Sequence, residues 1–283
     1  MVSPAVIEQL DPNSLQLGGK RTEITTLFAD IRGFTTYSES LPPEKLVSIL
    51  NLYLAAMAEA VLAQEGTIDK FMGDMLMAEF GALQPAPDHA ERAVCAALKM
   101  QRRLLDLRQQ WARQGWPSLQ CRFGINTGAV LLGNMGAREI VDYTVLGETV
   151  NFAARLERLN KTYGTSLLIS ESTHAQLSPQ LFRTRLLDRV KTHSSAMAIN
   201  LYEVYGDLAT FRSLRNTAYY QTYHEAFTAY LAQDFAGART KFFQTLAFYP
   251  DDPATKILLE RIATLLANGI PENWDGAATL GSL

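Results

Sequence analysis

The pattern of hydrophobic residues changes near Gly206. Before this point, short runs rich in β-branched and aromatic residues alternate with amphipathic helical patterns, whereas residues 213–268 carry helical patterns and no strand signal. Strands mixed with crossover helices of this length predict an α+β fold, with helices packed on one face of a sheet. We therefore expect a linker over residues 1–20, an α+β domain over 21–206 and a small α-helical extension over 207–283.

Local signals place the individual elements. Strands are predicted near residues 24–30, 67–71, 75–80, 120–126, 129–134, 140–146, 167–169, 184–190 and 199–205. Helices are predicted from Pro42–Pro43 to Gly66, from a capping-box pattern at Asp88 and Glu91 to Gln114, and over 149–161, 218–232, 235–248 and 253–267. The extension fits the tetratricopeptide pattern only loosely, at Ala226, Ala238, Phe242 and Pro250, and holds one unit at most.

Composition excludes several classes of protein. The chain has 283 residues, of which 47% are hydrophobic, and its net charge is −3. This is enough apolar material for a folded core, and the charge does not fit a general nucleic-acid binder. No uninterrupted apolar run is long enough to span a bilayer, and residues 1–20 lack a signal-peptide pattern. The two cysteines do not form a disulfide framework. We expect this segment to be cytoplasmic without a membrane span, although a longer protein that contained it could be tethered to a membrane.

Two aspartates stand at the ends of strand-like runs beside glycines. Asp30 ends the run that starts at Ile24 and is followed by Gly33, and Asp74 follows Gly73 in a predicted hairpin turn. Carboxylates at strand ends beside tight turns can converge on a hard cation and hold Mg²⁺ or Mn²⁺ against a triphosphate. An aspartate in such a place can also simply cap a turn. The pair makes the chain a candidate enzyme of phosphate chemistry.

Three segments, in this order, resemble the catalytic domain of class III nucleotidyl cyclases: Phe28–Thr35, Asp69–Asp74 and Asp142–Arg155. The resemblance covers about residues 22–206 and implies a ferredoxin-like sheet with helices on one face. It also implies cyclisation of a nucleoside triphosphate with two divalent metal ions, Mg²⁺ or Mn²⁺. Asp30 and Asp74 match the metal-binding aspartates of the family, and the carbonyl of Ile31 matches a backbone ligand.

The resemblance also implies how the base is recognised. Lys70 and Thr144 match the base-reading pair of the family. Adenine offers an acceptor at N1 and a donor at its amine, and Lys70 can only donate while Thr144 can accept. Guanylyl members of the family carry Glu and Cys at the positions of Lys70 and Thr144, and many adenylyl members carry Asp in place of Thr144. A threonine hydroxyl can also donate, so it selects adenine less strictly than Asp does.

Two further residues match the transition-state pair of the family. Asn151 and Arg155 are four residues apart on a predicted helix, so they project from one face. Arginine presents a planar fork to phosphate oxygens, and asparagine can orient the ribose ring oxygen.

The chain departs from the family before the last strand of the domain. Family members carry a valine-lysine-glycine-lysine run there, whereas this chain reads Lys191-Thr192-His193-Ser194-Ser195-Ala196. The two expected lysines fall at His193 and Ser195, and Lys191 could substitute for the triphosphate contact if the loop shifts. Losing one phosphate contact would weaken substrate binding or slow turnover.

The resemblance implies a homodimer with shared sites. Asp30 and Lys70 would come from one protomer, and Asn151 and Arg155 from the other. The leading hypothesis is an adenylyl cyclase that converts ATP to cyclic AMP and pyrophosphate, within a longer protein that carries an upstream sensor domain. The alternatives are a guanylyl cyclase with relaxed base recognition and a non-catalytic, cyclase-like regulatory module.

Overall fold

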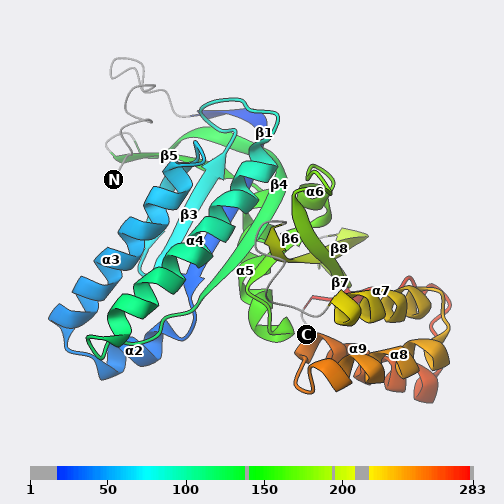
Figure 1. The fold of residues 1–283 in the computed structure, drawn as a ribbon. Helices are drawn as coiled ribbons and strands as arrows, with labels where there is room; N and C mark the ends of the chain where they lie inside the picture. Colours follow the sequence, from blue (N-terminus) through cyan, green and yellow to red (C-terminus); the bar gives the residue numbers. More distant parts are fainter. Residues whose placement is uncertain (1–17, 138–139, 193–194, 208–216, 281–283) are drawn as a thin grey trace. The chain divides into compact units, whose positions relative to one another are not determined.

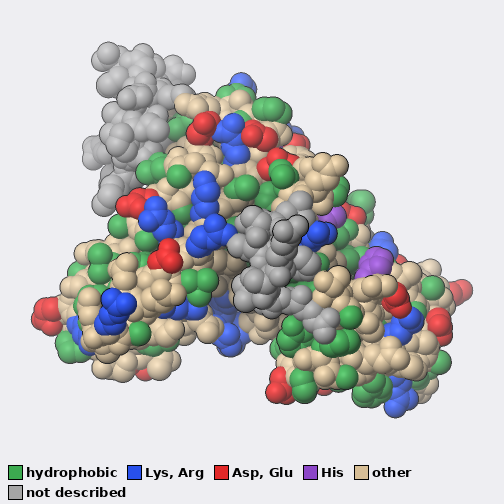
Figure 2. Space-filling model, viewed as in Figure 1, with side chains coloured by type: hydrophobic (Ala, Val, Ile, Leu, Met, Phe, Trp, Pro, Cys, Tyr) green, Lys and Arg blue, Asp and Glu red, His purple; other side chains and the backbone are tan. Residues whose placement is uncertain are grey.

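The computed structural model describes residues 18–137, 140–192, 195–207 and 217–280 (Figure 1). The chain divides into two compact units. The first unit is Met1–Arg158 with Ser172–Ser178, and the second is Leu159–Glu171 with Pro179–Leu283. The helices α5 (Glu148–Tyr163) and α6 (Glu171–His174) cross from one unit into the other. On the face drawn in Figure 2, acidic and basic side chains are interspersed over the described residues.

An antiparallel sheet forms the centre of the first unit. Its strand order is β2-β3-β1-β4, and β5 pairs with the free end of β4. The strands are β1 (Gly18–Ile31), β2 (Thr67–Met72), β3 (Met75–Phe80), β4 (Cys121–Ala137) and β5 (Ile140–Leu146). The hairpin predicted over residues 67–80 is confirmed, and Gly73 with φ +67° provides the left-handed residue of its turn.

Two long helices pack on one face of this sheet, α3 (Pro43–Leu62) and α4 (His89–Ala112), as Figure 1 shows. The contact is made by alternate residues of β1, because successive strand side chains point to opposite faces. Thr25, for example, accepts or donates a 2.7 Å hydrogen bond with Nδ1 of His89 at the start of α4. The short helix α2 (Phe34–Ser40) joins β1 to this layer.

The opposite face of the sheet carries α5 and part of β5. The buried residues that join these elements to the sheet are Ile24, Phe28, Met77, Val130, Leu132, Val145, Val150 and Ala153. Gly124 makes this packing possible, since a β-carbon there would lie 2.2 Å from the backbone nitrogen of Glu157. In the first unit, helices therefore cover both faces of the sheet. This corrects the expectation of helices on one face, because Ile24 and Phe28 present an apolar surface on the second face, and α5 covers it.

Among the described residues, α3 is the one helix that is long and apolar enough to cross a membrane by length and composition. Its apolar window has a mean hydropathy of 1.6, and 28% of that window is buried in the structure. The buried residues include Ile49, Tyr53 and Met57, which face the core of the first unit.

The second unit combines strands with the C-terminal helices. Its strands are β6 (Leu167–Ser170), β7 (Phe182–Thr192), β8 (Ser195–Asp207) and β9 (Ala278–Thr279), and its other helices are α7 (Thr217–Leu231), α8 (Phe235–Phe248) and α9 (Pro253–Asn268). β8 pairs antiparallel with β6 and β7, and β9 pairs in parallel with β7. The three C-terminal helices are thus confirmed close to their predicted bounds.

Buried ion pairs tie these helices to β7. Both terminal nitrogens of Arg261 on α9 donate to Asp188, each at 2.7 Å, and Asp188 is fully buried. Arg185 is also buried, 2.8 Å from Glu203 and with its guanidinium 4.4 Å from the centre of the Tyr223 ring. These contacts make the helical extension part of the second unit's core.

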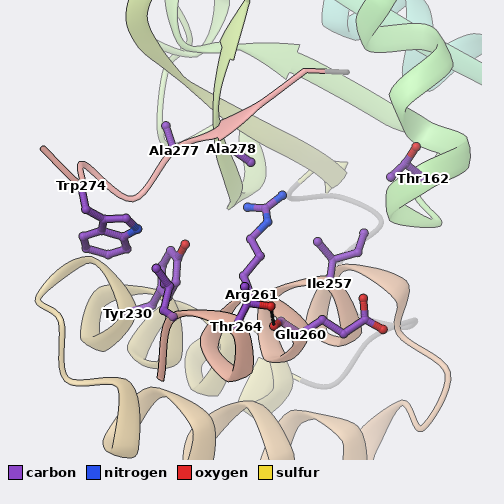
Figure 3. Close-up of a pocket in the computed structure, with 10 residues that line it drawn as sticks. Thr162, Tyr230, Ile257, Glu260, Arg261, Thr264, Trp274, Ala277 and Ala278 are labelled. Carbon is purple, nitrogen blue, oxygen red and sulfur yellow. Dashed lines mark hydrogen bonds between the residues drawn. The ribbon is translucent and has the colours of Figure 1, made fainter. Parts of the chain in front are cut away.

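A cavity of about 500 Å³ lies inside the second unit (Figure 3). Arg261 extends from α9 towards Ala278, and Trp274 lies against Tyr230 with ring centres 5.2 Å apart. None of the residues that line it, as far as the structure describes them, is a predicted site residue.

Three local expectations need correction. Residues 1–17 of the predicted linker lie outside the described residues, and Gly18–Lys20 belong to β1, where they pair with β4. The two strands predicted over 120–134 form one continuous strand, β4. The capping box does not form, because Asp88 accepts from Arg92 and Glu91 accepts from the amide of Ser178 instead.

Candidate active site

Asp30 and Asp74 meet at one end of the first unit's sheet. Asp30 is the penultimate residue of β1. Asp74 lies in the turn between β2 and β3, and β3 pairs with β1. Burial and the adjacent Asp30 carboxylate raise the pKa of Asp74 to about 6, although hydrogen bonds from its own amide and from that of Ile31 oppose the shift. The structure therefore brings together all three predicted metal-binding residues, Asp30, Ile31 and Asp74.

This arrangement fits a divalent cation of the Mg²⁺ type. Two carboxylates that face each other repel, and the repulsion is relieved when a cation lies between them. Mg²⁺ is commonly held by one or two carboxylates while substrate phosphates and water complete its shell. The described residues contain no group of three or more His, Cys, Asp or Glu side chains that could hold a metal ion, so the pair is not a closed protein cage.

Arg122 connects this acid pair to α5. Its guanidinium lies 3.3 Å from Asp30 and 2.9 Å from Glu157, whose side chain is only 1% exposed. Burial raises the pKa of Glu157 to about 7, although Arg122 opposes this shift. Sequence patterns do not single out Arg122 or Glu157, because the contact depends on the pairing of β4 with β1 and on the packing of α5.

Lys70 and Thr144 also lie together, through a shared carboxylate. The hydroxyl of Thr144 on β5 donates to Asp69 at 2.6 Å, and the Lys70 ammonium on β2 lies 3.1 Å from the same side chain. Lys70 also donates to Asp142. Burial lowers the pKa of Lys70, but its bonds to Asp142 and Asp69 outweigh this effect and raise it. Asp69 and Asp142 stand inside the quoted motifs, yet nothing in their spacing indicates this contact.

Asn151 and Arg155 lie on the exposed side of α5. The buried side is formed by Val150, Ala153 and Leu156, whereas Asn151 is exposed and Arg155 is partly exposed. Within the described part of the chain, neither side chain forms a hydrogen bond or ion pair. Both groups are therefore available to a ligand or to a second protein chain.

Lys191 lies in the second unit, on β7. Its ammonium is 2.8 Å from Asp275, and its carbonyl accepts a 2.8 Å hydrogen bond from the amide of Leu280. The lysine is thus held by the C-terminal segment. His193 lies outside the described residues, and nothing is described of the Ser195 side chain.

Comparison with known proteins identifies relatives of this arrangement. The family model "Adenylate and Guanylate cyclase catalytic domain" matches residues 19–206. "Adenylate cyclase 1" of Rhizobium meliloti (strain 1021) is 40% identical over 186 residues, which are 66% of this chain and 28% of that protein. "Adenylate cyclase" of Anabaena cylindrica is 37% identical over 211 residues, which are 72% of this chain and 40% of that protein. The chain therefore spans well under half of the length of these two curated relatives.

Solved structures show the same fold. The adenylyl cyclase CyaB from P. aeruginosa is 38% identical, with a TM-score of 0.61 over 67% of this chain and 97% of that one. The guanylyl cyclase Cya2 is 35% identical, with a TM-score of 0.61 over 69% of this chain and 98% of that one. The predicted α+β fold class, a sheet with helices packed on it and further helices at the C-terminus, is confirmed. The chain belongs to the family of adenylate and guanylate cyclase catalytic domains.

Proposed function

We propose that the chain is an adenylyl cyclase that converts ATP to 3′,5′-cyclic AMP and pyrophosphate. In this reaction the ribose 3′ oxygen bonds to the α-phosphorus, the bond to pyrophosphate breaks, and the hydroxyl proton leaves to solvent. Catalytic domains of this family generally use divalent metal ions, and they act as dimers that bind ATP. The observation that carries the choice of substrate is the pairing of Lys70 with Thr144 on Asp69.

That pairing supports adenine because it sets a donor beside an acceptor. The Lys70 ammonium has three hydrogens. It donates one to Asp142 and also lies 3.1 Å from Asp69, so at least one hydrogen remains for N1 of adenine. The oxygen of Thr144 retains lone pairs for the adenine amine. The likeness to a guanylyl cyclase structure keeps GTP as the second candidate substrate, and Lys70 opposes it because guanine N1 carries a hydrogen.

The other residues take the following proposed roles. Asp30 and Asp74, with the carbonyl of Ile31, would hold two Mg²⁺ or Mn²⁺ ions, which would acidify the 3′-hydroxyl and neutralise the triphosphate. Arg155 would bind phosphate oxygens as negative charge develops, and Asn151 would orient the ribose. Lys191 could bind the triphosphate only after exchanging its ion pair with Asp275. We further propose a homodimer with shared sites, and an upstream sensor domain in the complete protein.

Turnover by the purified chain tests the function. With Mg²⁺ or Mn²⁺, cyclic AMP is expected from ATP, with much less cyclic GMP from GTP, and chelation by EDTA should stop the reaction. Asp30→Ala should abolish turnover, and Lys70→Glu should lower the preference for ATP. A wild-type chain that forms neither product in concentrated solution would support the non-catalytic alternative instead.

A further inference from the structure

Asp69 occupies an irregular place in β2. The register between β2 and β3 shifts between Ile68 and Lys70, which leaves Asp69 in a bulge. A bulge re-aims side chains out of regular alternation. The Asp69 side chain is only 1% exposed, although aspartate is one of the charged residue types that are almost never fully buried without a partner. A buried carboxylate in a bulge beside Lys70 therefore requires an explanation.

The two oxygens of Asp69 serve different neighbours. Oδ2 accepts the hydroxyl hydrogen of Thr144 at 2.6 Å, whereas Oδ1 lies 3.1 Å from the Lys70 ammonium. The third neighbour is the buried Glu79, and burial together with Asp69 raises the pKa of Glu79, which favours its protonated form. Asp69 thus lies between a hydroxyl that donates to it and an ammonium, which is the setting of a carboxylate that accepts hydrogen bonds.

An ionised carboxylate can only accept hydrogen bonds. A threonine hydroxyl has one hydrogen, and charge-assisted bonds to carboxylates are roughly twice as strong as neutral ones. The short bond to Asp69 therefore fixes the direction of the Thr144 hydrogen. What remains on the outer side of the Thr144 oxygen is lone-pair density alone.

We propose that Asp69 is a specificity-determining positioning residue, which makes Thr144 a pure acceptor and thereby favours adenine over guanine. The proposal rests on the proposed role of Lys70 and Thr144 in base recognition. The adenine amine donates to the oriented oxygen, whereas guanine would place its O6 acceptor against it. The hydroxyl cannot rotate to donate to O6 without breaking its bond to Asp69. A threonine hydroxyl can otherwise donate as well as accept, and the bond to Asp69 leaves Thr144 only as an acceptor for the base.

Binding of 3′-deoxy-ATP and 3′-deoxy-GTP tests the proposal, because neither compound has the attacking hydroxyl. The quantity measured is the ratio of their dissociation constants in Mg²⁺. Asp69→Asn should lower the preference for adenine about tenfold or more, since an introduced amide that keeps its oxygen on Lys70 donates to Thr144 and turns the hydroxyl hydrogen outward. Asp69→Ala, which only frees the hydroxyl, should lower it by a smaller factor, and it provides a second variant if the first does not fold.

Two further variants separate this role from a general loss of charge around Lys70. Asp142→Asn removes the other carboxylate on Lys70 without touching Thr144, and should change the ratio by less than about threefold. In a Thr144→Val background, Asp69→Asn should have no further effect on the ratio, because there is no hydroxyl to orient.

The outcomes are distinct. An adenine preference that stays within about twofold of wild type in both Asp69 variants would overturn the proposal, as would an equal effect of Asp69→Asn with and without Thr144. A wild-type chain that binds 3′-deoxy-GTP as tightly as 3′-deoxy-ATP would also overturn it. Failure of the wild-type chain to form cyclic AMP from ATP would instead refute the proposed catalysis, and the binding ratio would still report on Asp69.

Discussion

At the scale of single residues, the two adjacent acids Asp30 and Asp74 fit a cation but destabilise the protein without one. Asp74 lies next to Asp30, and burial with this like charge raises the pKa of Asp74 to about 6. The Arg122 guanidinium, 3.3 Å from Asp30, offsets part of the repulsion between the two carboxylates. Functional sites often retain such unfavourable contacts because their benefit appears only when the ligand is bound.

Asp30→Asn should separate function from stability. Loss of one metal-binding carboxylate should lower cyclic AMP formation at least about a hundredfold. In EDTA, the unfolding midpoint should stay or rise, because the variant removes like-charge repulsion from the metal-free protein. The measurements are a turnover assay and thermal unfolding. The exposed Asp106→Asn on α4 serves as the matched control and should leave both unchanged. Full activity with a lowered midpoint in Asp30→Asn would contradict the metal assignment.

Glu157 predicts a dependence of stability on pH. Burial raises its folded-state pKa to about 7, above an ordinary value of about 4.3. A raised pKa means that the folded state binds the proton more tightly, so the contribution to stability is complete below about pH 4 and is lost as the pH rises through about 7. As the pH rises from 5 to 8, the free energy of unfolding of Glu157→Gln should therefore increase relative to that of wild type, by about 1 to 3 kcal/mol. Urea unfolding at several pH values measures this difference, and a constant difference would refute it.

At the scale of elements, α5 connects the buried network to the catalytic face. Its inner side carries Glu157, which contacts Arg122, and its outer side carries Asn151 and Arg155. The helix approaches β4 closely at Gly124, where a β-carbon would lie 2.2 Å from the backbone nitrogen of Glu157 and 2.3 Å from the carbonyl oxygen of Ala153. Neither neighbour is a flexible side-chain end, so the whole helix would have to move.

Gly124→Ala should thus impair both folding and catalysis. The collision with two backbone atoms should lower the free energy of unfolding by about 1 to 3 kcal/mol. The displaced helix should also lower kcat more than it raises KM, because Arg155 is proposed to act in the transition state. Gly115→Ala is an informative control, since nothing lies within 4 Å of a β-carbon there and the only penalty is its φ of +64°. Wild-type kcat in Gly124→Ala would show that α5 does not position the catalytic pair.

Elements with local signals could be predicted from the sequence. The hairpin over residues 67–80 has a turn at Gly73, and α9 begins at Pro253 after the capping residue Asp252, so short-range chemistry determines both. Gly18–Lys20 was predicted as linker because two glycines suggest a loop, and only pairing with distant β4 residues makes this segment a strand. The helix α2 was missed since it has no buried residues and hence no apolar periodicity.

The site was predictable only in part, for a related reason. Three motifs indicated Asp30, Asp74, Lys70, Thr144 and the pair on α5 through a family resemblance. The structure places the two acids together, and it places Lys70 and Thr144, the proposed base-reading residues, together on Asp69. The bond between Thr144 and Asp69 joins residues 75 positions apart. It depends on a β-bulge and on the packing of β5, and neither has a signature in a short sequence window.

At the scale of the whole molecule, a shared site requires that groups of one protomer meet groups of another. Asn151 is exposed and Arg155 is partly exposed, and neither has a partner among the described side chains, whereas Asp30 forms an ion pair with Arg122. A self-contained site would be expected to use the arginine within its own chain. Asn151 and Arg155 without partners fit one half of a shared site, to which a second protomer would contribute Asp30 and Asp74.

Mixing two inactive variants tests the shared site directly. In a mixed dimer of Asp30→Asn and Arg155→Ala, one site carries both lesions and the other carries none. Random pairing of equal amounts makes half of the dimers mixed, so about one quarter of wild-type activity should return, which rests on two-fold symmetry alone. Each variant alone should stay inactive at any concentration, and the recovered activity should rise with total protein as dimers form. Mixing Asp30→Asn with Lys70→Glu then locates Lys70, since activity with the wild-type preference for ATP over GTP returns only if Asp30 and Lys70 come from opposite protomers. If no activity returns when the first two variants are mixed although the dimers exchange subunits, both groups belong to one protomer and the shared-site arrangement is wrong.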